Sequence, residues 1–161
     1  MISAFGPYPM RSLPATRRAQ AKDAEGISRI ILRALRVTNA ADYPPHIIDA
    51  IAQNFTPKQV SAQLANRQAF VAVVDGQVVG TASLHGQVVR SVYVDPDHQK
   101  CGIGGKLMDA VEQLARDQSL GTLGVPSSIT AQGFYQRRGF IFVREEFHGD
   151  ERTIVMKKVL V

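Results

Sequence analysis

The sequence is poor in cysteine and histidine and contains no long apolar run. The single cysteine, Cys101, excludes a disulfide within the chain, and with four scattered histidines it gives no spacing typical of a metal site. No run approaches the roughly 20 apolar residues that a membrane helix needs. Residues 1–7 lack the basic start and apolar stretch of a secretory signal. We therefore expect a cytoplasmic protein without a bound metal.

Basic residues outnumber acidic ones, and the excess lies near the N-terminus. Residues 1–37 hold seven Lys or Arg and two Asp or Glu, whereas the rest of the chain holds twelve of each. Arg29, Arg33 and Arg36 recur at the spacing of one helix face. A nucleic-acid surface would interleave aromatic residues with the basic ones. The pattern therefore favours a solvated helix face over nucleic-acid binding.

The length of 161 residues is that of one domain. Residues 1–14 contain three prolines and a glycine, so we expect a flexible N-terminal arm there, followed by a single domain over 15–161. Met1 and Met10 are both candidate starts.

The spacing of apolar residues, together with the positions of glycine, proline and capping residues, predicts alternating strands and helices. Asp23 is the predicted cap of a first helix, Thr56 and Pro57 begin a later one, and Asp75-Gly76 is a hairpin turn. Gly121 and Gly139 are the predicted ends of two further helices. The predicted strands cover residues 16–21, 69–74, 77–84, 88–94, 122–125, 140–147 and 152–159, and the predicted helices cover 23–36, 46–54, 56–66, 102–118 and 128–138.

A glycine-rich turn joins a predicted strand to a predicted helix in the middle of the chain. The strand must end at Asp95-Pro96, because proline donates no N–H to a sheet. Gly102, Gly104 and Gly105 follow, where apolar residues begin to recur at helical spacing. The first N–H groups of a helix are unpaired and lie at the positive end of its dipole. This arrangement predicts an anion site, most often one for phosphate.

Two common glycine-rich phosphate sites fit this segment poorly. The loop of NTPases needs Ser or Thr after Gly-Lys, but Lys106 is followed by Leu107. The dinucleotide fingerprint needs a third glycine where Leu107 stands, and no acidic residue ends a second strand at the expected distance.

Residues 99–104 (QKCGIG) resemble the Q/R-x-x-G-x-G/A pyrophosphate loop of the GNAT superfamily of N-acetyltransferases. Residues 128–140 are similar to the later N-x-x-A-x-x-F-Y-x-x-x-G-F motif of that family, except that Ser128 replaces asparagine. The predicted order of elements also resembles the GNAT order along nearly the full length. The resemblance implies an α/β (α+β) fold, in which helices flank a mixed, mostly antiparallel sheet, and it implies acetyl-CoA as cosubstrate.

The resemblance also implies which residues hold acetyl-CoA. The backbone of Val92 and Val94 would pair with the pantetheine arm, and the N–H groups over residues 100–105 would hold the pyrophosphate. The cofactor-binding residues implied in this way are Val92, Tyr93, Val94, Gln99, Lys100, Cys101, Gly102, Ile103, Gly104, Gly105, Lys106, Ser128, Ala131 and Phe134.

Tyr135 matches the frequent general acid of the family, which would protonate the departing thiolate. No carboxylate occurs over residues 88–94 to act as general base. His85 is therefore the predicted base, because its ordinary pKa suits neutral pH, and a water chain is the alternative. Asp42 and Tyr43 lie in the helical segment that covers the acceptor side in this family, and they are the predicted substrate-binding residues.

These features predict an N-acetyltransferase that moves the acetyl group of acetyl-CoA directly to a primary amine of a small molecule or peptide. The alternative is a non-catalytic acyl-CoA-binding regulatory module. The identity of the acceptor, the length of the acyl chain and the association into a homodimer stay open. Cys101 lies at a helix start, where the pKa of a thiol tends to fall, so we expect it to be readily oxidised rather than catalytic.

Overall fold

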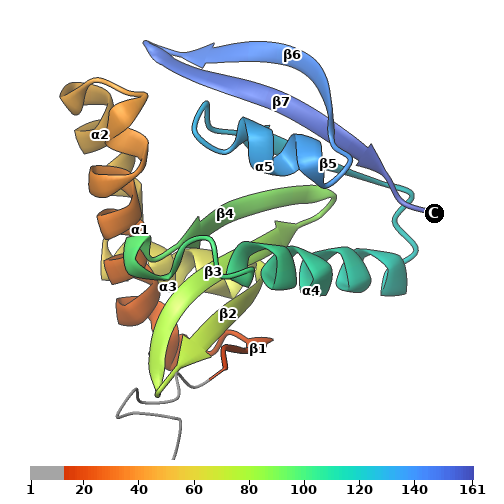
Figure 1. Ribbon diagram of the computed structural model, residues 1–161, viewed down its shortest axis with the longest axis horizontal. Helices are drawn as coiled ribbons and strands as arrows, with labels where there is room; N and C mark the ends of the chain where they lie inside the picture. The colour runs from red at the N-terminus through yellow and green to blue at the C-terminus, as the bar shows by residue number, and fades with distance from the viewer. Residues whose placement is uncertain (1–12) are drawn as a thin grey trace, which may run out of the picture.

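The computed structural model describes residues 13–161, which form one seven-stranded sheet with helices on both faces (Figure 1). The strand order is β1-β2-β3-β4-β5-β7-β6, and among these residues β4–β5 is the only parallel pair. The predicted mixed, mostly antiparallel sheet is thus confirmed. The strands are β1 Ala15–Arg18, β2 Gln68–Val74, β3 Gln77–His85, β4 Val88–Val94, β5 Thr122–Ser127, β6 Ile141–His148 and β7 Glu151–Val159.

Helices α1 and α4 cover opposite faces of β3 and β4. Alternate residues of β2 point to the two sides: Ala72 joins the core under α4, whereas Val71 joins the core under α1. The helices are α1 Ala24–Val37, α2 Pro45–Ala52, α3 Pro57–Asn66, α4 Ile103–Asp117 and α5 Gln132–Arg137, with short 3-10 turns η1 Ala21–Asp23, η2 Asn39–Ala41, η3 Gln53–Phe55 and η4 Pro96–His98.

Several predicted boundaries are confirmed by local geometry. Asp75 and Gly76 both have positive φ (51° and 76°), as the tight turn between β2 and β3 requires. The Thr56 side chain accepts a hydrogen bond from Gln59 N (3.2 Å) and caps α3, with Pro57 in its first turn. The predicted N-terminal arm lies almost entirely in residues 1–12, outside the described residues, as do both candidate starts.

Asp23 is the N-cap residue of α1, as predicted, but its side chain makes no capping hydrogen bond to that helix. The Asp23 carboxylate instead accepts from Gln20 N (2.7 Å) and pairs with Arg17 of β1 (2.8 Å). The Arg17 guanidinium holds the pKa of this carboxyl below its usual value. The side chain therefore fastens the first strand to the helix, a role that the position before a helix does not reveal.

Two helix ends also differ from the prediction. Helix α4 ends before Gly121: Ser119 takes the left-handed conformation (φ 59°), and Leu120 N donates to Ala115 O (3.0 Å). Helix α5 is shorter than expected at its start, because Ser128 Oγ accepts from Ala131 N (3.1 Å) and closes a turn instead. The end of α5 at Gly139 (φ 93°) is confirmed.

The arginines of the predicted basic face on α1 bind groups within the chain. Arg33 forms an ion pair with Asp95 (2.7 Å), and Arg36 forms one with Asp49 (3.1 Å). Arg29 donates to the carbonyl oxygen of Val78 (3.3 Å). The excess of basic residues at this end of the chain is thus partly used in packing α1 against its neighbours.

Strands β4 and β5 diverge after one point of contact. Their register holds a single pair of residues, Val88 and Gly124. In Figure 1, β2–β4 lie below and β6–β7 above, with α5 in the region where the two parts separate. Backbone groups along the second half of β4 on this side are therefore not occupied by β5, and cavities form on both sides of the divergence.

Candidate active site

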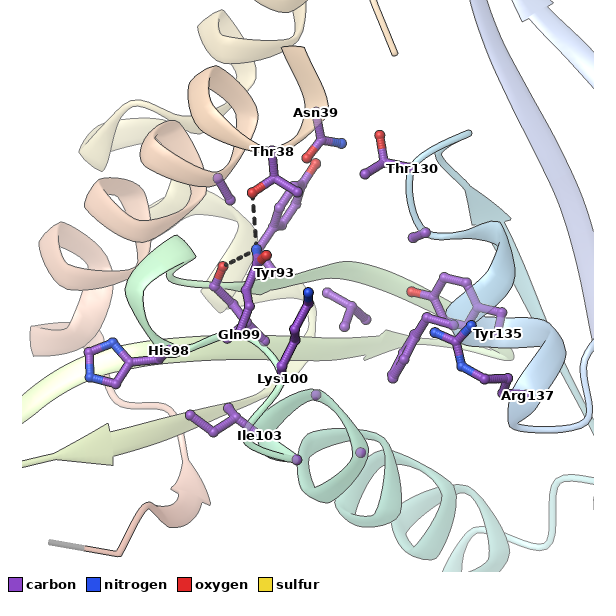
Figure 2. A pocket seen from close by; sticks show the side chains of 18 residues that line it. Thr38, Asn39, Tyr93, His98, Gln99, Lys100, Ile103, Thr130, Tyr135 and Arg137 are labelled. Carbon is purple, nitrogen blue, oxygen red and sulfur yellow. Dashed lines mark hydrogen bonds between the residues drawn. The ribbon is translucent and has the colours of Figure 1, made fainter. Parts of the chain in front are cut away.

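The first cavity, of about 380 Å³, lies where the end of β4, the loop to α4, helix α5 and the end of α1 meet (Figure 2). It contains most of the residues that the resemblance implies for cofactor binding. The lining residues are Ala34, Thr38, Asn39, Val92, Tyr93, Val94, His98, Gln99, Lys100, Gly102, Ile103, Gly104, Gly105, Thr130, Ala131, Phe134, Tyr135 and Arg137.

The loop between β4 and α4 is anchored before the glycines begin. Asp95 Oδ1 accepts from Asp97 N (2.9 Å), and the two oxygens of Asp95 also bind Arg33 Nη1 (2.8 and 2.7 Å). The Asp95 carboxylate is buried and both its oxygens accept from the same nitrogen of the partly exposed Arg33, so this ion pair fixes the loop against α1. The position of the glycine-rich turn therefore depends on a residue pair that is distant in the sequence.

The start of α4 faces the first cavity with unpaired backbone donors. Gly102 is the N-cap in the left-handed conformation (φ 78°), which a residue with Cβ adopts only at a cost. The helical ladder begins with the bond from Lys106 N to Gly102 O (3.1 Å), so the N–H groups over residues 103–105 precede it. These donors, at the positive end of the helix dipole, form an anion site.

Two cations flank this anion site. Lys100 and Arg137 line the first cavity, and neither has an ion pair within residues 13–161. Figure 2 shows Lys100 rising from the loop and Arg137 reaching in from α5. Arg137 was not predicted from the sequence, because nothing in its local pattern distinguishes it from Arg138. Arg138 instead binds Glu112 (2.7 Å) and Asp109 (2.8 Å).

Gln99 has two partners within the chain. Its Nε2 donates to Thr38 Oγ1 (3.0 Å) and to Val94 O (3.3 Å), as the dashed lines in Figure 2 show. The side chain thus links the end of α1 to the end of β4. Nearby, His98 Nδ1 is buried without a hydrogen-bond partner in the described chain.

Three predicted cofactor residues lie outside the first cavity. Cys101 and Lys106 are exposed and line neither cavity, and the Cys101 thiol contacts Gln99 O (3.5 Å). Ser128, which stands where the family has asparagine, lines the cavity on the other side of the sheet. Its Oγ is already engaged as the turn acceptor before α5.

The second cavity, of about 390 Å³, lies between the diverging strands on the side of α3. It shares Val92, Tyr93, Ala131 and Tyr135 with the first cavity, so the two cavities meet at these side chains. The other lining residues are Ile51, Asn54, Phe55, Gln59, Gln63, Arg67, Val89, Arg90, Ser91, Val125, Pro126, Ser127, Ser128, His148, Glu151 and Thr153.

Tyr135 stands at the junction of the two cavities. Its ring packs edge-to-face against Phe134 (5.2 Å between centroids) and Phe140 (5.4 Å), so its position is fixed by the core. Figure 2 shows the hydroxyl turned toward the cavity, and no hydrogen bond joins it to another group of residues 13–161. Burial, with a smaller contribution from Tyr93, raises the pKa of this phenol well above its usual value, so it stays protonated at neutral pH.

The structure does not bring His85 to this junction. His85 ends β3, is exposed and lines neither cavity. A titratable side chain that does line the second cavity is Glu151, at the start of β7, where it shares a face with Thr153. Its carboxylate lies near enough to Tyr93 to raise the pKa of that phenol, after burial, which is the larger cause. Glu151 follows a hairpin turn 16 residues after Tyr135, and only the pairing of β7 with β5 brings it here.

Asp42 and Tyr43 fasten two parts of the chain together. The Tyr43 hydroxyl accepts from Ile129 N (2.8 Å) and donates to Arg152 O (2.8 Å), and Asp42 accepts from Thr130 Oγ1 (2.8 Å). Neither residue lines either of the two cavities, and Tyr43 is buried. Their described contacts join the segment after α1 to the turn before α5, so the structure gives them a positioning role.

Comparison with known proteins identifies the family. Residues 39–160 match the model of a family described as an acetyltransferase (GNAT) domain. The chain belongs to the GNAT acetyltransferase family. It is 31% identical over 130 residues to YafP of Escherichia coli K12, described as an uncharacterized N-acetyltransferase, and the match covers 81% of this chain and 83% of that protein.

Solved structures support the same fold. A GCN5-related N-acetyltransferase from Rhodopseudomonas palustris superposes with a TM-score of 0.86 at 28% identity, over 95% of this chain and 99% of that one. The PaiA N-acetyltransferase of Thermoplasma acidophilum, solved in complex with coenzyme A, gives a TM-score of 0.76 at 15% identity, over 91% and 99% of the chains. The latter likeness concerns the fold alone.

Within residues 13–161, no group of three or more His, Cys, Asp or Glu side chains is placed to hold a metal ion. In the same part of the chain, no helix is both long and apolar enough to cross a membrane.

Proposed function

We propose that this GNAT family member is an N-acetyltransferase that uses acetyl-CoA and acetylates a primary amine. The observation that carries the proposal is the pair of cavities that meet at Val92, Tyr93 and Tyr135. One cavity has the anion site of α4 and the cations Lys100 and Arg137, which suit the pyrophosphate of acetyl-CoA. The other cavity leaves room for an acceptor on the opposite side of β4.

The divergence of β4 from β5 supports a place for the pantetheine arm. Backbone groups of Val92 and Val94 lie beyond the single pair that joins the two strands, and both residues line the first cavity. An extended ligand can add to such a strand edge through main-chain hydrogen bonds. The PaiA structure was solved with coenzyme A and shares this fold, and a structure from Bacillus anthracis that superposes on 58% of this chain was solved in complex with acetyl coenzyme A.

The proposed reaction is a direct transfer. The amine nitrogen attacks the carbonyl carbon of the thioester, the C–S bond breaks, and the sulfur leaves as a thiolate that must be protonated. Tyr135 is buried at the junction and its hydroxyl is protonated and unengaged, so it is the proposed donor to that sulfur. The ring contacts with Phe134 and Phe140 hold the donor in place.

The amine must lose a proton before or during its attack, because an alkylamine is mostly protonated at neutral pH. Glu151 is the proposed acceptor of that proton, directly or through water, since it is the carboxylate of the second cavity. His85 was the candidate from the sequence, but it lies outside both cavities. Variants of Glu151 and His85 can therefore be compared, because only Glu151 lines a cavity.

The test is a thiol-release assay with acetyl-CoA and a panel of amines and peptides, with mass spectrometry of the acetylated products. We expect release that depends on the amine. The variant Glu151→Gln should lower kcat by at least about tenfold, whereas kcat of His85→Gln should stay within about twofold of the wild type, because His85 lines neither cavity. Acetyl-CoA binding without release on any amine would contradict the proposal and favour the regulatory acyl-CoA-binding module.

Association of two copies is proposed through β6. In the described chain this strand pairs only with β7, and its exposed side chains include Ile141, Phe142 and Phe147. An antiparallel pairing of two β6 strands would bring the exposed apolar side chains of the two copies together. Sedimentation should give a dimer, and Phe142→Arg should give a monomer; a monomer from the wild type would contradict the proposal.

A further inference from the structure

Two arginines of the second cavity have no anionic partner among residues 13–161. Arg67, which follows α3, is half-buried, and its Nη1 donates to the neutral Ser91 Oγ (3.0 Å). Arg90, on β4, makes no side-chain hydrogen bond and no ion pair with any group of residues 13–161. Both residues line the cavity.

Two other arginines that are held against the core do have carboxylate partners. Arg33 reaches a buried carboxylate (2.7 Å), and so does Arg138 (2.7 Å). A guanidinium does not lose its charge in a protein, so removing it partly from water beside a second cation costs free energy. Burial, and after it the charge of Arg90, lower the pKa of Arg67. An anion bound in the cavity would offset both the burial of the Arg67 guanidinium and its repulsion from Arg90.

A local distortion of β4 lies directly after Arg90. Tyr93 lies opposite Thr81 and Arg90 opposite Ser83, so two residues of β4, Ser91 and Val92, face one residue of β3. Ser91, which accepts the hydrogen bond from Arg67, takes positive φ (53°), which is strained for a residue with a Cβ. The bulge therefore forms part of the cavity wall between the two arginines.

The second cavity therefore suits a ligand that carries both a negative and a positive group. Arg67 and Arg90 offer N–H donors for planar or tetrahedral oxyanions, and Glu151 offers a carboxylate for an ammonium group. We infer that the acceptor is an amine that also carries an anionic group, a carboxylate or a phosphate, and that Arg67 and Arg90 bind this group. The inference rests on the proposed transferase function and specifies the substrate class.

The first experiment compares matched acceptors that differ in the anionic group. L-Phenylalanine is compared with L-phenylalaninamide, and O-phosphoethanolamine with ethanolamine, in the thiol-release assay. At least one charged member should exceed its neutral counterpart by about tenfold or more in kcat/KM, the factor expected for a charge-assisted hydrogen bond. The pair that shows the preference tells a carboxylate from a phosphate. Equal rates within both pairs would overturn the inference while the transferase function stands.

The second experiment changes the arginines. Arg90→Gln removes an exposed side chain without partners, so its fold should be kept. It should raise KM for the preferred anionic acceptor by about tenfold or more and leave KM for the neutral counterpart unchanged. Arg67→Lys keeps the charge and should retain more activity than Arg67→Gln. Lys58→Gln, an equal charge change on α3 outside both cavities, is the control. If Lys58→Gln also lost the preference for the anionic acceptor over its neutral counterpart, the inference would be overturned.

The third experiment measures anion binding without turnover. Phosphate and acetate are titrated calorimetrically into protein saturated with CoA, which occupies the anion site of α4. We expect saturable binding of at least one anion to the wild type and to Lys58→Gln, and binding at least about tenfold weaker to Arg90→Gln. No saturable binding of either anion overturns the inference. If the protein bound an anion but released no thiol with any amine, both the proposed transferase function and the inferred acceptor class would be contradicted.

Discussion

The substitution Tyr135→Phe removes one hydroxyl and nothing else from the junction of the two cavities. The ring contacts with Phe134 and Phe140 do not involve the oxygen, and the oxygen has no partner in the described chain. The free energy of unfolding should therefore change by no more than about 1 kcal/mol at neutral pH. Truncation to alanine, in contrast, should cost about 3–5 kcal/mol, because the ring is fully packed in the core.

The effect on turnover should be much larger than the effect on stability. A positioned proton donor contributes about 10²–10⁴ in rate, which corresponds to about 2.7–5.4 kcal/mol of activation free energy. We expect kcat of Tyr135→Phe to fall by about this range in the thiol-release assay. Affinity for acetyl-CoA should stay within about threefold, because the anion site of α4 and its cations are untouched.

The assay separates the two roles that Tyr135 could have. If the side chain were only a packing residue, Tyr135→Phe would keep its kcat. Wild-type turnover in this variant, at unchanged acetyl-CoA affinity, would refute the assignment of the hydroxyl as proton donor. A fall in affinity with unchanged kcat would refute it as well.

Three other predictions follow from the same geometry. Gly104→Glu should weaken acetyl-CoA binding by about a hundredfold or more, because a Cβ at Gly104 would lie 3.4 Å from the Phe134 ring beside the anion site. Gly121→Glu is the control, because a Cβ at Gly121 would meet open space. Equal affinities of the two variants for acetyl-CoA would contradict the assignment of the anion site. Tyr43→Phe should lower the free energy of unfolding by about 1–3 kcal/mol, since two partly buried backbone groups lose their partner, yet it should leave acceptor KM unchanged. A rise in KM would restore the predicted substrate role of Tyr43. The free energy of unfolding should fall above pH of about 10, where Tyr43, Tyr93 and Tyr135 ionise in the unfolded chain but stay neutral in the fold, which raises the pKa of each. Tyr135→Phe should reduce that slope by up to about 1.4 kcal/mol per pH unit in urea titrations, and an unchanged slope would contradict the raised pKa.

The parts of the fold that depend on local pattern could be predicted from the sequence. The Asp75-Gly76 turn, the Thr56 cap and the glycine-rich start of α4 each satisfy a backbone requirement within a few residues. The residues of that start, together with Tyr135, do line the first cavity as the resemblance implied. These predictions succeed because each backbone conformation depends only on residues that are close together in the sequence.

The parts that depend on distant partners could not be predicted. The contact of Arg33 with Asp95 spans 62 positions, and that of Tyr43 with Ile129 spans 86. Nothing near Asp42 and Tyr43 shows that their side chains bind the turn before α5 rather than a substrate. Similarly, Arg67 and Arg90 line one cavity although one follows α3 and the other lies on β4.

The most direct test of the account is the calorimetric titration of acetyl-CoA into the full chain at moderate ionic strength. The anion site of α4, with Lys100 and Arg137 beside it, predicts saturable one-to-one binding in the micromolar range that weakens as salt rises. The absence of saturable binding would contradict the assignment of the first cavity to acetyl-CoA and, with it, the proposed transfer chemistry.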